Sequence, residues 1–242
     1  AGEAQSTYDN AIKDIVSGMI HNDFDRMLHR AAQKMNQVAV NPGIKPCVGI
    51  VGEFYSCINS WANNDIINEM ESLGVEVRLG TSPSDYLIYF NESYPKVRFK
   101  EKKYINSMYY QIRKTFLLYE KQKIEHIFGK SFYKTFHTPA SRIRSRLTAA
   151  YIDPVVDPIM TVNVSKAKEY ALNNCDGIAN LIVLNCLYGN VTSAIYRKLQ
   201  KEHNGLPILT LTYDGLKSTN EKTRIEAFIH QVKNHHLQQL KN

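Results

Sequence analysis

The sequence predicts an α/β fold, in which a parallel sheet of about four strands is covered by helices on both faces. Two observations support this prediction. Short and nearly continuous apolar runs alternate with segments of helical periodicity, which is the pattern of a parallel sheet buried on both sides. In addition, 43% of the 242 residues are hydrophobic and 22% are charged. These values are average for globular proteins and sufficient for a sizeable core.

The first part of the chain shows helical spacing. Apolar residues recur at three- and four-residue steps between Tyr8 and Val38, and Asn22–Asp23 is expected to divide this segment into two helices. The turn-forming residues Asn41–Gly43 then end the helical region. We therefore predict an N-terminal helical segment at residues 1–44.

Strands and helices alternate in the rest of the chain. The strands are expected at Pro46–Gly52, Val75–Leu79, Ile178–Asn185 and Pro207–Tyr213. The helices are expected at Asn63–Leu73, Tyr104–Phe128, Ser165–Asn173, Gly189–His203 and Thr219–Leu240. Right-handed crossovers place the first strand between the second and the third. The predicted architecture is a Rossmann-like domain formed by residues 45–85 and 152–242.

A basic helical insertion is expected at residues 86–151, because this connection is longer than any ordinary loop between strands. Between Lys96 and Arg146 the chain has 14 Lys and Arg and 3 Asp and Glu, so this segment accounts for the net positive charge of the protein. We predict that it packs as a cap beside the sheet. A basic surface attracts phosphates or an acidic partner. No nucleic-acid-binding motif accompanies the charge, which argues against nucleic acid.

Several classes of protein are disfavoured. No apolar run approaches the roughly 18 residues that span a bilayer, and the first residues lack the pattern of a signal peptide. We therefore expect a cytoplasmic protein with reduced cysteines and no membrane partner. The sequence lacks the G-x-S-x-G and H-E-x-x-H motifs of the corresponding hydrolases. Because it does not begin with Met, we also expect it to be a piece of a longer protein.

A ligand crevice is expected beyond the carboxyl ends of the strands, where open α/β sheets bind their ligands. Gly52 is expected to let the chain turn sharply at the end of the first strand. Glu53 is interpreted either as a helix cap or as a functional carboxylate. The residues expected to surround this crevice are Gly52, Glu53, Tyr55, Asn63, Cys186, Gly189 and Asp214.

Cys186 is the cysteine best placed for chemistry. It follows the third strand at the start of a helix, where a thiolate is stabilised and can act as a nucleophile or as an iron ligand. Cys57 lies in the loop after the first strand and is a second, weaker candidate ligand in the same crevice. Cys47 and Cys175 precede strands, so we expect them at the opposite edge of the sheet as buried structural residues.

Two parts of the sequence resemble a known family. Val48–Tyr55 reads V-G-I-V-G-E-F-Y and is followed by Trp61–Asn64, which resembles the family's opening V-G-I-V-G-E-[IF]-Y with N-x-[FW]-A-N-N after it. The stretches that resemble its closing part are Asp176–Cys186, Pro207–Leu209, Tyr213–Gly215 and Thr223–Phe228. The family is the acyl-CoA dehydratase activase-related group, which is similar to D-component subunits of 2-hydroxyacyl-CoA dehydratases and benzoyl-CoA reductases.

The resemblance implies a function within a larger assembly. It makes this region the C-terminal module of an iron–sulfur protein that serves ATP-driven electron transfer to acyl-CoA chemistry. Its partners would be upstream dehydratase-like and ATP-hydrolysing activase domains or subunits, and its basic segment could attract the phosphates of acyl-CoA. Cys186 matches the cysteine of the family's C-M-P-G stretch, which implies a ligand of a [4Fe–4S] cluster in the complete assembly.

Two departures from the family weigh on this interpretation. The stretch Cys186–Gly189 reads C-L-Y-G and lacks the proline, and the glutamate that usually precedes the family's S-K-A helix is replaced around Asp157–Ile159. In addition, the family's other cluster cysteines lie upstream, in a domain that this chain lacks. A cluster requires about three or four thiolates. We therefore expect neither a cofactor nor catalysis in this chain alone. The alternative is a non-catalytic binding or scaffold domain that keeps the fold without a cluster.

Overall fold

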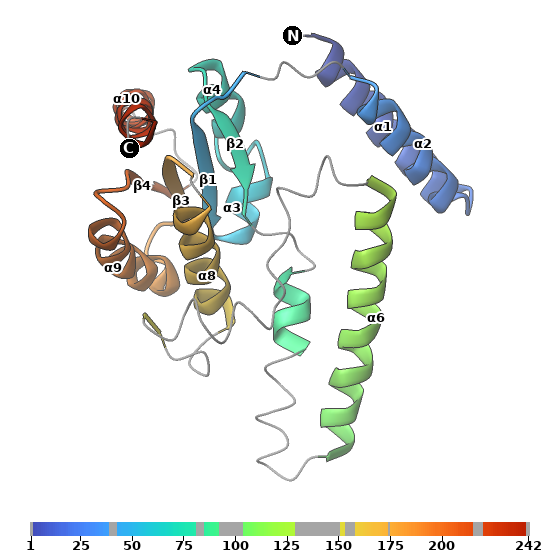
Figure 1. Cartoon of the computed structure of the whole chain (residues 1–242). Helices are drawn as coiled ribbons and strands as arrows, with labels where there is room; N and C mark the ends of the chain where they lie inside the picture. Colours follow the sequence, from blue (N-terminus) through green and yellow to red (C-terminus); the bar gives the residue numbers. More distant parts are fainter. Residues whose placement is uncertain are drawn as a thin grey trace. The chain divides into compact units, whose positions relative to one another are not determined.

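A computed structural model describes residues 2–38, 43–80, 85–91, 104–128, 151–152, 158–173, 175–214 and 220–240. The chain forms two compact units (Figure 1). The first unit comprises Ala1–Gly43 and Ile112–His137, and the second comprises Ile44–Gln111 and Thr138–Asn242. The second unit contains the sheet.

The sheet has four strands, and all neighbouring pairs are parallel. They are β1 (Cys47–Gly52), β2 (Glu76–Leu79), β3 (Gly177–Val183) and β4 (Ile208–Tyr213). Their order is β2-β1-β3-β4, so β1 lies between β2 and β3 as the crossover rule predicts. The predicted α/β fold class is confirmed.

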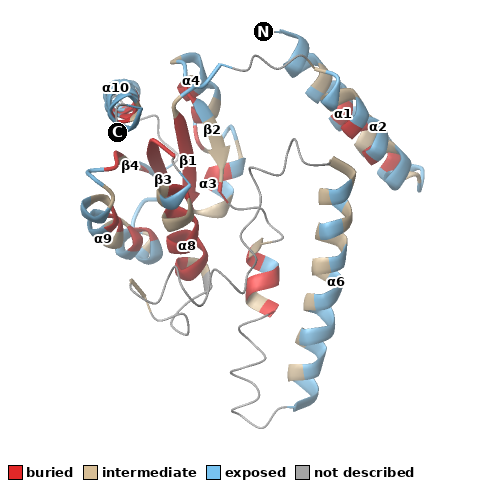
Figure 2. Cartoon of the chain, in the orientation of Figure 1, coloured by how far each residue is buried: buried red, intermediate tan, exposed pale blue. Residues whose placement is uncertain are grey.

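Helices cover both faces of this sheet. The helices of the second unit include α3 (Phe54–Ile58), α4 (Ile66–Ser72), α8 (Pro158–Leu172), α9 (Leu187–Glu202) and α10 (Glu221–Gln239). On one face, Ile50 of β1 packs in a core with residues of α4 and α10. On the other face, the next residue, Val51, packs with residues of α8 and α9, because successive side chains of a strand point to opposite faces. Figure 2 shows β1 and β3, the two central strands, buried between these helices.

One aromatic ring lies very close to the backbone of the sheet. Tyr170 of α8 packs over Gly49 of β1, where an added Cβ would lie only 2.3 Å from the ring carbon Cδ2. The Tyr170 hydroxyl donates a hydrogen bond to the carbonyl oxygen of Arg78 at 3.1 Å. The missing side chain of Gly49 therefore creates the space that brings α8 against the sheet.

The first unit contains a helical hairpin. Its helices are α1 (Gly2–Ile20) and α2 (Phe24–Asn36), and they are separated at Asn22, which has a left-handed φ of 60°. The predicted division at Asn22–Asp23 is therefore confirmed. A Cβ on Gly18 would lie 2.7 Å from Cγ of Met27, so the glycine permits the close approach of α1 to α2. Within this unit, Lys123 of α6 (Tyr104–Phe128) forms an ion pair with Asp25 of α2 at 2.7 Å.

Some element boundaries differ from the sequence prediction. β3 ends at Val183 and not at Asn185, because the chain turns at Asn185 with a φ of 60°. α8 begins at Pro158, well before the expected start at Ser165. Proline is tolerated at the first position of a helix, where its missing N–H group has no partner to lose.

The basic insertion is described only in part. α6 has the predicted bounds Tyr104–Phe128, whereas residues 92–103 and 129–150 lie outside the described residues. The concentration of basic side chains on a cap therefore stays a prediction. Among the described residues, no helix is both long enough and apolar enough to cross a membrane.

A candidate ligand pocket at the carboxyl end of the sheet

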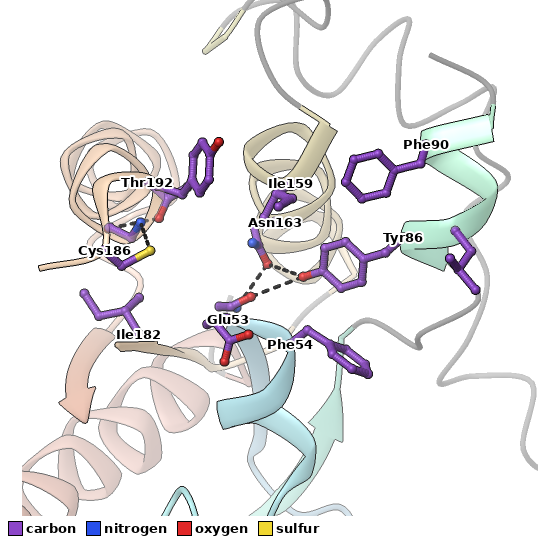
Figure 3. Close-up of a pocket in the computed structure, with 13 residues that line it drawn as sticks. Glu53, Phe54, Tyr86, Phe90, Ile159, Asn163, Ile182, Cys186 and Thr192 are labelled. Atoms are coloured by element: carbon purple, nitrogen blue, oxygen red, sulfur yellow. Dashed lines mark hydrogen bonds between the residues drawn. The ribbon is translucent and has the colours of Figure 1, made fainter. Parts of the chain in front are cut away.

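A pocket of about 380 Å³ opens at the carboxyl ends of β1 and β3 (Figure 3). The chain leaves β1 toward α4 on one face of the sheet and leaves β3 into α9 on the other face. The pocket thus lies at the topological switch point, where open parallel sheets bind ligands. Its lining residues are Gly52, Glu53, Phe54, Tyr86, Leu87, Phe90, Ile159, Asn163, Ile182, Cys186, Tyr188, Gly189 and Thr192.

Gly52 forms the floor of the pocket in a backbone conformation that favours glycine. Its φ is 134°, and a Cβ at this position would lie 2.0 Å from the carbonyl oxygen of Leu181 on β3. The N–H group of Glu53 donates to the same carbonyl oxygen at 2.7 Å. The sharp turn expected from the sequence therefore occurs here, and it brings the chain directly across the end of the neighbouring strand.

Glu53 caps the short helix α3. Its carboxylate accepts hydrogen bonds from the backbone N–H groups of Tyr55 and Ser56 at 3.0 and 2.7 Å. It also accepts one from the Ser56 hydroxyl at 3.0 Å. Of the two interpretations of Glu53, the helix cap is the one that these contacts support, because the carboxylate oxygens are committed to α3.

Cys186 is the N-cap of α9. Its sulfur accepts a hydrogen bond from the N–H group of Gly189 at 3.4 Å, and the residue is half-buried. Gly189 packs against β3 so closely that a Cβ would lie 2.7 Å from Cγ2 of Ile182. The glycine therefore lets α9 start immediately beside the strand end. The Cys186 thiol consequently faces the pocket, as Figure 3 shows.

The wall opposite Cys186 is built by α8 and by a short helix at residues 85–91. The Tyr86 hydroxyl lies 3.2 Å from both the carbonyl oxygen of Gly52 and the Asn163 Oδ1 atom. Asn163 Oδ1 also accepts from the N–H group of Gly52 at 3.1 Å. The Phe54 ring packs edge-on against Tyr86, with 5.9 Å between the ring centroids. This network ties three separate segments into one wall (Figure 3).

The structure brings together some of the expected site residues and not others. Gly52, Glu53, Cys186 and Gly189 line the pocket, whereas Tyr55, Asn63 and Asp214 do not. The Tyr55 side chain is 51% exposed on α3. Asn63 is buried and donates from Nδ2 to the carbonyl oxygen of Ser56 at 2.9 Å, so it fixes the turn between α3 and α4. Asp214 follows β4 and is exposed.

The other cysteines lie away from the pocket. Cys57 is buried in the core on the α4 and α10 face of the sheet. Burial and the nearby Glu53 carboxylate raise the pKa of the Cys57 thiol, which favours its protonated form. Cys47 and Cys175 are buried together at the amino end of the sheet.

Much of the apolar wall was not expected from the sequence. Tyr86 and Phe90 share one face of the helix at residues 85–91 because they are four positions apart. This spacing was a usable signal, but the sequence offers no direct signal that Asn163 contacts Gly52. That contact depends on the first turns of α8, which begins before its predicted start.

The described residues contain no group of three or more His, Cys, Asp or Glu side chains that could hold a metal ion. In the pocket, Cys186 is the thiol that could bind iron. No protein-family model, curated protein or solved structure matches this chain. Chemically, the pocket offers an apolar cavity with one thiol at its edge and a few oriented polar groups, which suits the binding of a small and mainly apolar group.

Proposed function

We propose that the second unit is the C-terminal module of an activase/2-hydroxyacyl-CoA dehydratase-like iron–sulfur protein, which serves ATP-driven electron transfer to acyl-CoA chemistry. The main support is that the two stretches that carry the family resemblance meet at one pocket. Gly52, Glu53 and Phe54 come from the first stretch, and Cys186 ends a stretch more than one hundred residues later. Both would therefore face the same partner or ligand.

The chain by itself does not fit a whole iron–sulfur cluster. A cluster needs about three or four thiolates, and when bound it would supply one-electron transfer. Cys186 can offer one of them, while Cys57 packs on the α4 and α10 face and is buried there. The proposal therefore limits this chain to a single ligand, and the remaining ligands would come from other domains. The hydrogen bond from the Gly189 N–H group would help to hold the Cys186 sulfur in place.

Anaerobic reconstitution tests this role. The chain is incubated with ferrous iron, sulfide and an excess of 2-mercaptoethanol, which can occupy the iron positions that other domains would fill. We expect iron, sulfide and the broad visible absorption of a cluster to elute with the protein in gel filtration, provided that the column buffer also contains 2-mercaptoethanol. Cys186→Ala should lose them, and the matched Cys57→Ala variant should retain them. Equal iron in both variants, or no retained iron in the unmodified chain, would overturn the proposal.

A second candidate is a non-catalytic binding domain. It is favoured by the apolar wall of Phe54, Phe90, Ile159 and Ile182, and by a volume of about 380 Å³, which suits a small organic ligand. Calorimetric titration with a medium-chain fatty acid tests it. Binding should be abolished by Ile159→Asp, unchanged by Ile124→Asp on the exposed surface of α6, and independent of iron and Cys186. Absence of heat, or equal loss in both variants, would contradict this function.

A further inference from the structure

Cys47 and Cys175 form a close pair that the pocket does not use. Their sulfur atoms are 2.9 Å apart although the residues are 128 positions apart in the sequence. Cys47 opens β1, and Cys175 immediately precedes the start of β3, so the pair lies at the amino end of the sheet. Both residues are buried, with 5% and 1% of their surface exposed.

The backbone holds both cysteines in this position. The N–H group of Asp176 donates to the carbonyl oxygen of Cys47 at 2.8 Å, and the N–H group of Cys47 donates to Asp176 Oδ2 at 2.7 Å. The N–H group of Cys175 donates to the carbonyl oxygen of Tyr170 at 3.0 Å. Because a disulfide bond is about 2.05 Å long, the sulfur atoms need to approach by less than about 1 Å.

A shared metal ion does not account for this geometry. Two thiolates bound to one tetrahedral zinc ion lie about 3.7 Å apart, which is farther than the distance found here. In the part of the chain that the structure describes, no third metal-binding side chain joins the pair. The pair is therefore arranged for sulfur–sulfur chemistry.

We propose that Cys47 and Cys175 are a redox-active pair, which a small peroxide such as hydrogen peroxide converts into an intramolecular disulfide. Arg78 lies close enough to interact electrostatically with both sulfur atoms. The hydrogen bond with Cys47 and burial raise the pKa of the Cys175 thiol. We assign the first attack to the Cys47 sulfur, because the raised pKa of Cys175 disfavours a thiolate at that residue.

The reaction balances in two steps. The Cys47 thiolate attacks one peroxide oxygen, the O–O bond breaks, and the departing hydroxide takes up the proton that Cys47 released, giving water and a sulfenic acid. The Cys175 sulfur then attacks the Cys47 sulfur, the S–O bond breaks, and a second water leaves with the Cys175 proton. Two thiols have lost two electrons, and the peroxide has gained them. A dithiol reductant reverses the change.

The disulfide would close a very large ring. The residues between the two cysteines include β2, the helix at residues 85–91, α6 and the whole of α8. Oxidation would therefore link the start of β1 covalently to the residue just before β3. The long connection between the two cysteines could then unfold while the two strands stay joined. Such a constraint on the unfolded chain raises the melting temperature.

Peptide mapping tests the pair directly in the unmodified chain. After peroxide treatment the protein is unfolded, free thiols are alkylated, and the chain is digested without reduction by proteases that cleave after Glu and before Asp. Glu53 separates Cys47 from Cys57, and Asp176 separates Cys175 from Cys186, so each cysteine lies in its own peptide. We expect a Cys47–Cys175 cross-link that disappears on treatment with dithiothreitol. Full alkylation of both residues, or cross-links between other cysteines, would overturn the proposal.

Thermal unfolding supplies a second measurement with matched variants. Peroxide should raise the melting temperature of the unmodified chain and of Cys57→Ala by about 5 °C or more, and dithiothreitol should reverse the rise. Cys47→Ala and Cys175→Ala should show no rise. If these two variants fail to fold, the peptide map of the unmodified chain decides alone. An equal rise in Cys47→Ala would contradict the assignment.

Discussion

Replacing Gly52 with alanine should strongly destabilise the sheet, because two separate costs arise at this residue. The φ of 134° is strained for any residue with a side chain, at about 1–3 kcal/mol. The new Cβ would also lie 2.0 Å from the Leu181 carbonyl oxygen, whereas real Cβ atoms stay beyond 3.0 Å. The end of β1 must therefore move away from β3.

The movement of the end of β1 away from β3 lowers the stability further. It weakens the hydrogen bond from the N–H group of Glu53 to the carbonyl oxygen of Leu181, now 2.7 Å long, at about 1 kcal/mol. It also costs the repacking that accompanies an overfilled site, about 1–3 kcal/mol. We therefore expect Gly52→Ala to lower the free energy of unfolding by about 4 kcal/mol, which is a large part of the stability of an ordinary domain.

Gly205→Ala is the matched control. Gly205 also has a positive φ, 74°, but no atom lies within 4 Å of its added Cβ. This variant should lose only about 1 kcal/mol, which is the cost of the backbone conformation alone. Urea unfolding followed by far-ultraviolet circular dichroism gives both values. If Gly52→Ala were no less stable than Gly205→Ala, the steric argument at Leu181 would be wrong.

Three further outcomes are expected. In the native chain, an alkylating reagent should modify half-buried Cys186 rapidly and Cys57 only on unfolding; protection of Cys186 would contradict an accessible site. Burial lowers the pKa of His235 in the folded chain below 6.5. As the pH drops through about 6.5, His235 is therefore protonated more readily in the unfolded chain than in the folded chain, and the stability falls. His235→Gln should reduce this loss of stability at low pH, whereas His230→Gln, at an exposed position, should not. Equal urea midpoints for the unmodified chain and for His235→Gln at every pH would show that His235 is not responsible. Tyr86→Phe should cost about 1 kcal/mol of stability, measured by urea unfolding, because its hydroxyl bonds at Gly52 and Asn163 are lost; an unchanged stability would show that they contribute nothing.

The fold followed from the sequence because its signals are local. Apolar runs marked the four strands, and the order of the strands followed from the handedness of their crossovers. The residues at strand ends, such as Gly52 and Cys186, could be placed at the pocket for the same reason. Element ends were less accurate, since Asn185 ends β3 through a left-handed backbone conformation that its neighbours do not signal.

The rest of the pocket depends on contacts between distant segments. Asn163 and Tyr86 contact Gly52 from elements that are more than thirty residues away along the chain. The periodicity of the sequence does not predict such long-range contacts. Asn63 shows the opposite case, because it was expected in the crevice but serves a turn next to it. The position of a residue after a strand end predicts which part of the molecule it lies in. It does not predict where the side chain points, because that depends on local hydrogen bonds.

The fit of Tyr170 over Gly49 has a consequence for divergence among related sequences. A methyl group at position 49 would displace the ring, and the Tyr170 hydroxyl would then lose its partner at Arg78. Neither position can therefore change freely in evolution while the other stays the same. We expect relatives with this sheet to keep glycine at position 49 wherever position 170 is aromatic, and to accept larger residues there only alongside a smaller residue at 170. A paired substitution of this kind would identify distant relatives that share few other residues with this chain.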